Sequence, residues 1–250
     1  MKLTNVVIVG AGGTASFLAP VLAKLLAFNQ EGDCTLTIID EDLVEDKNLS
    51  RSYTEDDVGM NKAALLAEIC TDQVPSGSLQ ISAIEAYVTP DNFDRYHQNW
   101  CRDGVAVFAC VDNNVSRCFL EDQLSALDNA VYITPGNAEF DGQVHMYLRQ
   151  NGSDVTPKIT EFCPEMQDSE TPGNQFPDEE NCTEKYESEP QLILANLTAA
   201  TMSLNLFWSQ IQQRSDRTDY VNEILFDVVS CGARPDKRVP IKPLEPSTIS

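Results

Sequence analysis

Basic residues are scarce in this chain of 250 residues, which has 17 Lys and Arg against 39 Asp and Glu and a formal net charge of -22. Such a charge repels phosphate backbones and anionic lipid, so we expect no nucleic-acid partner and no membrane partner. An acidic surface is typical of soluble proteins, and it also suits a basic protein partner. The charge therefore excludes two classes of partner without identifying one.

Long apolar runs are also missing, since no uninterrupted apolar stretch reaches the length of a membrane span. The opening "MKLTNVVIVG" runs into an apolar segment without a charged leader and a cleavage site, so we expect a cytoplasmic protein. No Lys-Ser/Thr pair follows the first glycines to complete a Walker motif, which argues against an ordinary P-loop ATPase.

Histidine occurs only twice, as His97 and His145 in different segments. Two separate histidines offer little to a histidine-based hydrolase or a His-rich metal centre, and we expect each on the surface or in packing. The eight cysteines include no C-x-x-C pair, so a structural zinc site of the usual spacing is not supported. Without a secretory signal, a disulfide framework is not expected either.

A glycine-rich motif, "VVIVGAGGTASFL", occupies residues 6–18. A β-branched run precedes the glycines and apolar residues at helical spacing follow them, which predicts a strand, a turn and a helix. Gly10 permits the tight turn, Gly12 allows a phosphate near the backbone, and the N–H groups at the helix start attract the anion. Gly10, Gly12 and Gly13 are therefore candidate nucleotide-binding residues. The motif suits the pyrophosphate of a dinucleotide and the triphosphate of ATP equally.

Strand and helix patterns alternate along the chain, which predicts an α/β fold with a doubly wound, mostly parallel, Rossmann-like sheet. The segment "GQVHMYLR" follows a predicted strand after a short turn and predicts an antiparallel addition to that sheet. The predicted strands are 6–9, 35–40, 79–88, 104–111, 130–136, 142–149 and 223–230, and the predicted helices are 17–28, 60–71, 115–127 and 190–213.

The length of the chain fits one large domain with a full core. We assign residues 1–231 to a single domain, in which residues 151–190 form a long acidic crossover loop. Residues 232–250 are proline-rich and locally basic, and we expect them to form an extended C-terminal tail.

A block of polar residues follows the second predicted strand. Asp40 ends that strand, where a carboxylate can accept hydrogen bonds from both ribose hydroxyls of a nucleotide. Asn48, Arg51 and Lys62 come next, within one excursion from the sheet. The two cations would offset the charge of a triphosphate and stabilise the leaving pyrophosphate, which a nicotinamide dinucleotide does not require. The alternative is that each cation simply pairs with a nearby acidic residue such as Glu55 or Asp57.

A second block, "ACVDNNVSR", follows the predicted central strand 104–111. Ligands of open α/β sheets bind at the carboxyl ends of the strands, so Asp112 and Asn113 should face the same crevice as the glycine motif. A carboxylate there can hold the magnesium ion that bridges ATP phosphates. Alternatively, the pair caps the next helix and Arg117 is a surface charge.

Together these motifs resemble the family of ThiF, MoeB and the activating enzymes of ubiquitin-like proteins, over residues 5–150. The matching segments, in order, are "GAGGTAS", "DEDLVEDKNLSR", "GMNK" and "VDNNVSR". The resemblance implies a domain that binds ATP with Mg²⁺ and adenylates the C-terminal glycine carboxylate of a small ubiquitin-like or sulfur-carrier protein. The residues it assigns are Gly12 and Asp40 for the nucleotide, Asn48, Arg51 and Lys62 for the phosphates, and Asp112 for magnesium.

The sequence also departs from the family pattern. The paired C-x-x-C zinc motifs of many bacterial members are absent. Those members also carry a basic N-terminal segment that lends an arginine to the partner subunit's ATP, whereas here only Lys2 precedes the first strand. The resemblance implies a homodimer, but the usual source of this arginine is missing.

A cysteine nucleophile is a further possibility, because many activating enzymes pass the acyl-adenylate to a cysteine on the crossover loop. Cys182, in "NCTEKYESEP", lies at that point, in a segment that is also similar to the ThiF relatives of PRTRC gene clusters. Cys163 is the competing candidate. The neighbouring glutamates disfavour the thiolate that a nucleophile requires, so a non-catalytic loop cysteine remains an alternative.

We therefore expect an adenylating enzyme whose candidate catalytic residues are Arg51, Lys62, Asp112 and Cys182. An NAD-dependent oxidoreductase would explain the glycines and Asp40 but would leave the remaining candidates without a function. Two more functions fit the motifs: modification of a peptide or a tRNA base by a family member, and a catalytically silent scaffold that binds ATP.

Overall fold

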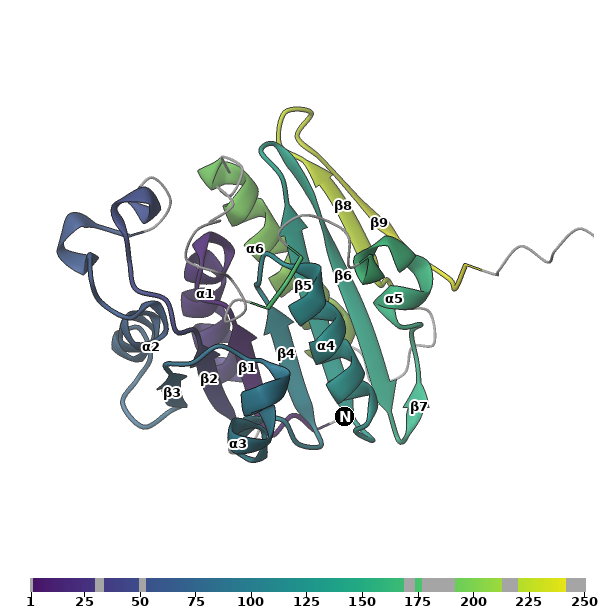
Figure 1. The fold of residues 1–250 in the computed structure, drawn as a ribbon, viewed down its shortest axis with the longest axis horizontal. Helices are drawn as coiled ribbons and strands as arrows, with labels where there is room; N and C mark the ends of the chain where they lie inside the picture. The colour runs from purple at the N-terminus through teal and green to yellow at the C-terminus, as the bar shows by residue number, and fades with distance from the viewer. Residues whose placement is uncertain are drawn as a thin grey trace, which may run out of the picture.

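The computed structural model describes residues 2–29, 34–49, 53–168, 174–176, 192–212 and 220–241. Within these residues the strands form one nine-stranded sheet in the order β3-β2-β1-β4-β5-β6-β8-β9, with β7 paired to β6 (Figure 1). The strands are β1 (Asn5–Val9), β2 (Thr35–Ile39), β3 (Gln80–Ile84), β4 (Val105–Ala109), β5 (Ala130–Asn137), β6 (Asp141–Gln150), β7 (Ser153–Asp154), β8 (Glu223–Asp227) and β9 (Gly232–Asp236).

The helices alternate with the parallel strands. They are α1 (Gly13–Asn29), α2 (Lys62–Asp72), α3 (Pro90–Trp100), α4 (Asn114–Ser125), α5 (Ile159–Phe162) and α6 (Ile193–Phe207), and a π-helical turn, Trp208–Gln212, continues α6. Short 3-10 turns are η1 (Asp46–Asn48), η2 (Glu55–Asp57) and η3 (Pro164–Gln167).

The strand directions confirm the predicted fold class. Strands β3, β2, β1, β4 and β5 are parallel, whereas β6, β8 and β9 extend the sheet in antiparallel pairs. The chain order reverses between β1 and β4, whose last residues, Val9 and Ala109, lie side by side. In open α/β sheets, ligands bind in the crevice outside such a reversal point. The fold therefore directs attention to the loops that follow β1 and β4.

Helices cover both faces of the sheet, which explains the continuous apolar runs of its central strands. Every residue of β1 and of β4 is buried. Helices α1, α2 and α6 contribute to the core on the face that carries Ile8 and Phe108, and α3, α4 and α5 contribute on the face that carries Val7 and Val107 (Figure 1). Burial of each such apolar side chain contributes about 1.5–3 kcal/mol to the free energy of folding. The strand ends at the reversal point are therefore held by a well-packed core.

Four observed elements differ from the expectations from sequence: β7 and α5 lie in the segment expected to be a loop, and neither α3 nor β9 was expected. Helix α3 was not predicted; it begins with Pro90, a favoured first helical residue, and it buries Phe93 and Trp100 on one side. Strand β9 pairs with β8, so the sheet continues into the segment that we expected to be a tail. Residues 169–173 and 177–190 of the expected acidic crossover lie outside the described residues, so the domain boundaries remain a prediction. In the part of the chain that the structure describes, no helix has the length and apolar character needed to cross a membrane.

Candidate functional site

Gly10 begins the turn after β1, and its conformation is one that only glycine adopts easily. Its φ is +89°, and a Cβ atom at this position would lie 2.6 Å from the carbonyl oxygen of Cys110. Backbone hydrogen bonds hold the turn from both sides, from Gly10 N to Ile39 O (2.8 Å) and from Cys110 N to Val9 O (2.8 Å). Gly10 is therefore required by the protein itself, because the loops after β1 and β4 touch there.

Gly12 is in a different situation. A Cβ atom at Gly12 would meet no atom within 4 Å, and its φ lies outside the left-handed region. Helix α1 starts at the next residue, Gly13, and has no acidic residue in its first turn. The N-terminus of a helix carries partial positive charge and N–H groups without intrahelical partners, so it attracts anions. The space over Gly12 thus opens beside an anion-attracting group.

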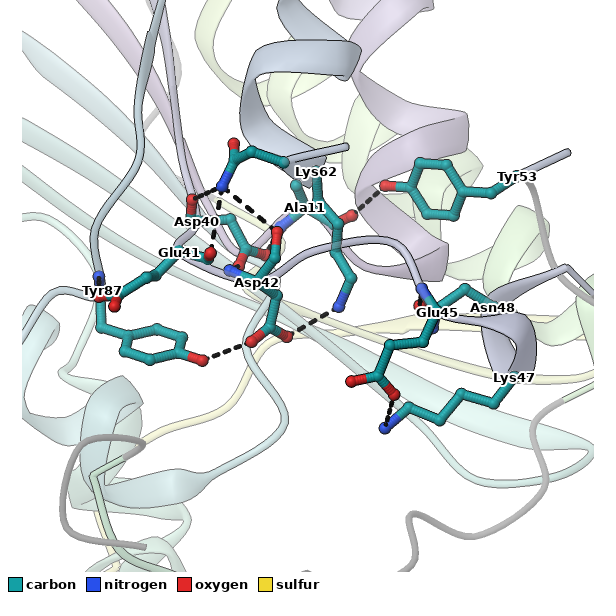
Figure 2. Close-up of polar contacts among 11 residues, drawn as sticks. Ala11, Asp40, Glu41, Asp42, Glu45, Lys47, Asn48, Tyr53, Lys62 and Tyr87 are labelled. Carbon is teal, nitrogen blue, oxygen red and sulfur yellow. Dashed lines mark hydrogen bonds and ion pairs between the residues drawn. The ribbon is translucent and has the colours of Figure 1, made fainter. Parts of the chain in front are cut away.

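Asp40 lies directly under the glycine turn (Figure 2). Its Oδ2 atom accepts a hydrogen bond from Ala11 N at 2.6 Å, and its Oδ1 atom accepts one from Asp42 N at 2.8 Å. Burial raises the pKa of the Asp40 carboxyl, and the hydrogen bond from Ala11 offsets part of this effect. Asp40 therefore ties the loop after β2 to the glycine turn. The ribose contact implied by the resemblance remains a prediction.

Lys62 opens α2 and points toward the loop after β2, where it meets Asp42 (Figure 2). Only 9 % of its side chain is exposed, and its Nζ atom lies 2.7 Å from Oδ2 of Asp42. The hydroxyl of Tyr87 donates to the other oxygen of Asp42. Burial acts to raise the pKa of Asp42, but the hydrogen bonds from Lys62 and Tyr87 outweigh it and lower that pKa. Lys62 therefore pairs with an acidic residue, as in the alternative, but the partner is Asp42 and not Glu55 or Asp57.

Asn48 and Tyr53 support the same region. Asn48 is buried in η1, where its Oδ1 atom accepts a hydrogen bond from Glu45 N at 2.9 Å. Tyr53 is buried and donates its hydroxyl hydrogen bond to the carbonyl of Ala11, in the glycine turn (Figure 2). The predicted phosphate ligand Arg51 lies outside the described residues. The excursion after β2 thus folds back onto the glycine turn.

Three polar residues of the block after β4 have different structural environments. Asp112 is exposed at the carboxyl end of the sheet, next to the backbone that Gly10 touches. Asn113 is the N-cap of α4, and its side chain accepts from Ser116 N at 2.8 Å, so the capping alternative holds for Asn113 but not for the rest of the block. Arg117 is not a surface charge, because its Nη2 atom donates to the carbonyls of Val111 (2.7 Å) and Pro135 (3.0 Å).

A short described part of the crossover, residues 174–176, lies against this block. Asn174 Oδ1 accepts a hydrogen bond from Val115 N at 2.6 Å, in the first turn of α4. The ring of Phe176 packs edge-on against Phe119, with 5.8 Å between ring centroids. The chain therefore passes over the start of α4 on its way from η3 to α6.

The two candidate nucleophiles are not part of the described site. Cys182 lies outside the described residues. Cys163 is buried between α5 and η3, and burial, followed by the charge of Glu165, raises its pKa to about 12. A thiol that keeps its proton at neutral pH is a poor nucleophile, which argues against Cys163 as the thioester-forming residue.

The sequence reasoning missed Asp42, Tyr53 and Tyr87. Asp42 follows Asp40 by two residues, so the D-x-D pattern "DED" at 40–42 was the available signal. The two tyrosines carried no signal, because each reaches its partner across 42 and 45 residues of chain. The described site is therefore a glycine turn with an open approach, an internally paired lysine and an exposed aspartate.

Comparison with solved structures places this fold among known proteins. E. coli MccB with ATP superposes with a TM-score of 0.64 at 17% sequence identity, over 96% of this chain and 64% of that one. E. coli MccB with selenomethionine-labelled MccA gives a TM-score of 0.65 at 17% identity, over 98% of this chain and 66% of that one. Selenomethionine-labelled PaaA gives 0.63 at 18% identity, over 94% and 64%. This chain thus spans about two thirds of the length of these relatives, and the likeness at such identity concerns the fold.

Sequence comparison gives a narrower result. No curated protein sequence matches the chain. A family model described as "ThiF family" matches residues 1–205, which include the glycine turn, the loop after β2, the block after β4 and most of α6. Because this match extends over far more than half of the 250 residues, the chain belongs to the ThiF family.

Proposed function

We propose that this protein uses ATP to adenylate the C-terminal carboxylate of a peptide or small carrier protein. The observation that carries the proposal is the open space over Gly12, beside the N-terminus of α1 and at the reversal point of the sheet. Nothing among the described residues requires a glycine there, whereas a phosphate that approaches the backbone does. Membership of the ThiF family and the likeness to MccB, which was solved with ATP, support the same conclusion.

In this proposal the backbone N–H groups at Gly12 and Gly13 bind the phosphates. Lys62, which is linked to the turn by contacts through Asp42 and Asp40, would exchange its carboxylate partner for a phosphate oxygen. Arg51 acts as a second cation, as the resemblance implies. A substrate carboxylate oxygen attacks the α-phosphorus, the bond to the β-phosphate oxygen breaks, and pyrophosphate leaves with the electron pair. Fixed positive charge around the phosphates stabilises this transfer of charge.

Asp112 is the residue that we assign to magnesium. Its carboxylate is exposed at the carboxyl end of β4, and hard oxygen ligands of this kind suit Mg²⁺. Bound to ATP, the ion would neutralise part of the phosphate charge. Arg117 positions this aspartate, because it holds the carbonyl of the preceding residue, Val111.

The substrate is proposed on chemical grounds. MccB was solved with selenomethionine-labelled MccA, which favours a polypeptide substrate, and the family resemblance favours a ubiquitin-like or sulfur-carrier protein that ends in glycine. The net charge of -22 favours a substrate with a basic surface around its tail. Transfer of the acyl group to Cys182, a homodimer and a cytoplasmic location complete the proposal; each rests on the sequence.

Calorimetric titration with Mg-ATP and, separately, with NADH tests the proposal. We expect Mg-ATP to bind and NADH not to bind. Asp112→Asn should weaken Mg-ATP binding by about 100-fold or more, because even indirect metal partners contribute 10- to 100-fold. The matched control is Asp122→Asn, which removes a carboxylate that is exposed on α4 and pairs with Lys158.

A second assay measures exchange of labelled pyrophosphate into ATP in the presence of glycine-terminated peptides. Exchange that needs the peptide and is lost in Asp112→Asn supports adenylation. Binding of NADH alone would favour the oxidoreductase alternative. Mg-ATP binding without exchange, for every peptide and carrier offered, would favour the silent scaffold.

A further inference from the structure

Three chemically reactive side chains meet in the antiparallel part of the sheet, away from β1, where α5 covers β6 and β8 (Figure 1). His145 on β6 and Glu223 on β8 are cross-strand partners in the antiparallel register. Cys163, at the junction of α5 and η3, contributes its thiol from the segment that covers these strands. All three residues are buried, at 6 %, 2 % and 6 % exposure for His145, Glu223 and Cys163.

The ligand atoms of these residues converge on one point. His145 Nε2 lies 3.1 Å from Glu223 Oε1 and 3.9 Å from Cys163 Sγ, and one such atom from each of the three residues lies within 4.8 Å of the other two. A tetrahedral zinc ion, with bonds of about 2.0–2.3 Å, holds neighbouring N, O and S ligands about 3.3–3.6 Å apart. The observed spacing brackets this range, so small side-chain adjustments suffice to enclose an ion.

A second observation points to a missing partner. Oε2 of Glu223 is buried without a hydrogen-bond partner among the described residues, although the other oxygen of the same carboxylate contacts His145 and Arg238. A buried carboxylate oxygen without a partner is costly, and native proteins rarely leave one. A cation in the cluster would satisfy this oxygen.

From this convergence we propose that His145, Cys163 and Glu223 form a binding site for a divalent transition-metal ion, with zinc the best fit. Imidazole, thiolate and carboxylate are all zinc ligands, and three protein ligands leave one position for water. The ligands lie far apart in the sequence, which explains why a search for C-x-x-C spacing found nothing. The proposal does not depend on the adenylation proposed above.

The charges around the cluster agree with this assignment. The thiolate and the carboxylate together balance the two charges of a divalent ion, and the Cys163 thiol gives up its proton to solvent when the ion binds. That arginine donates to Glu223 Oε1 at 2.8 Å and packs over the ring of Phe162, with 5.4 Å from Cζ to the ring centroid. A cation that hydrogen-bonds a metal-binding carboxylate orients it without competing for the metal, as outer partners of zinc ligands do.

The competing interpretation is a network without metal. In that network Arg238 and His145 pair with Glu223, and Cys163 is only a packing residue. The two interpretations differ in what they predict for the thiol. In the metal site Cys163 is a ligand, whereas in the network its replacement by serine changes no binding property.

Titration with Co²⁺ after treatment with a chelator tests the proposal on the full-length chain. We expect one Co²⁺ per chain, with a sulfur-to-cobalt charge-transfer absorption band. Cys163→Ser should abolish that band, and Glu223→Gln should weaken Co²⁺ binding at least about tenfold. Cys231→Ser is the matched control, because it removes an exposed cysteine outside the cluster, and it should bind as the wild type does.

Two further measurements use only the wild type, so they remain decisive even where a variant does not fold. Zn²⁺ at 100 times its Kd should raise Tm by about 5–10 °C for a domain of this size. X-ray absorption at the zinc edge should show one Zn–S bond of about 2.3 Å with N or O ligands at about 2.0–2.2 Å. Absence of stoichiometric Co²⁺ binding, a charge-transfer band that persists in Cys163→Ser, or a zinc spectrum without sulfur would overturn the proposal.

Discussion

Substitution of alanine at Gly10 and at Gly12 separates what the fold needs from what a ligand needs. The two glycines stand two residues apart in the same turn, but a Cβ atom at Gly10 would collide with the backbone of Cys110, whereas one at Gly12 would enter open space. We expect Gly10→Ala to damage stability and Gly12→Ala to damage nucleotide binding.

The magnitudes follow from the geometry. At Gly10, a positive φ costs a non-glycine residue about 1–3 kcal/mol, and relief of the overlap with a backbone carbonyl costs a similar amount, so we expect a loss of about 2–6 kcal/mol. Gly12→Ala should instead leave the free energy of unfolding unchanged or raise it by about 0.4–1 kcal/mol, because alanine restricts the unfolded chain. The added Cβ atom would occupy the space proposed for the phosphate and hold it away from the backbone. Loss of one hydrogen bond from a backbone N–H to the phosphate, worth about 1.5–3 kcal/mol, should weaken ATP binding about 10- to 150-fold.

Urea denaturation and calorimetric titration with Mg-ATP measure the two effects on the same preparations. The reasoning is refuted if Gly12→Ala binds Mg-ATP as tightly as the wild type, since the open space would then have no connection with phosphate. It is equally refuted if Gly10→Ala retains full stability, since the contact with Cys110 would then be loose.

Three other predictions concern single contacts. Tyr53→Phe removes the hydrogen bond to the carbonyl of Ala11 and should lower the free energy of unfolding in urea by about 0.5–1.5 kcal/mol. Asn113→Ala removes the N-cap of α4 and should lower it by about 0.5–2 kcal/mol, whereas Asn113→Asp, which keeps the capping oxygen, should not. The hydrogen bond with His145 lowers the pKa of Glu223; burial opposes this effect, and the hydrogen bond from Arg238 adds to it. The native state therefore gains stability above the unfolded pKa of about 4.3 and loses this stability as the pH falls through the folded pKa. Glu223→Gln should therefore flatten the acid side of a stability-against-pH curve measured in the presence of a chelator, and an unchanged acid slope would contradict this.

Much of the fold could be predicted because its signals are local. The run 104–111 is apolar throughout because β4 is buried on both faces, and the alternating segment 142–149 does form strand β6, although residues 144–148 are buried on both faces of the sheet. Helix α3 was missed because its sequence, "PDNFDRYHQNW", is mostly polar; among its side chains that the structure describes, the large ones that reach the core are Phe93 and Trp100. Strand β9 was missed because "GARPD" is exposed at the sheet edge and has no apolar pattern.

The candidate site was predictable in its outline but not in its internal pairing. Positions of the glycines, Asp40 and Asp112 follow from strand ends, which a sequence pattern locates well. The partner of Lys62 depends on how a loop folds back, and no spacing rule gives that; the lysine meets Asp42, twenty residues earlier. His145 was expected on the surface or in packing, and only the register of β6 with β8 brings it to Glu223.

Because Arg117 bonds backbone carbonyls inside the fold, its presence in a sequence indicates the architecture and not catalysis. In the D-N-x-x-x-R element, the asparagine caps a helix and the arginine holds two carbonyls inside the fold, so both residues serve the architecture. A lysine would not reproduce these contacts, because Nε and Nη2 of the planar guanidinium both donate to Val111 while Nη2 also donates to Pro135, and an ammonium group lacks this fixed fork. Under the magnesium role proposed for Asp112, relatives that have lost catalysis would keep the asparagine and the arginine, and a change at the aspartate alone would distinguish them from enzymes.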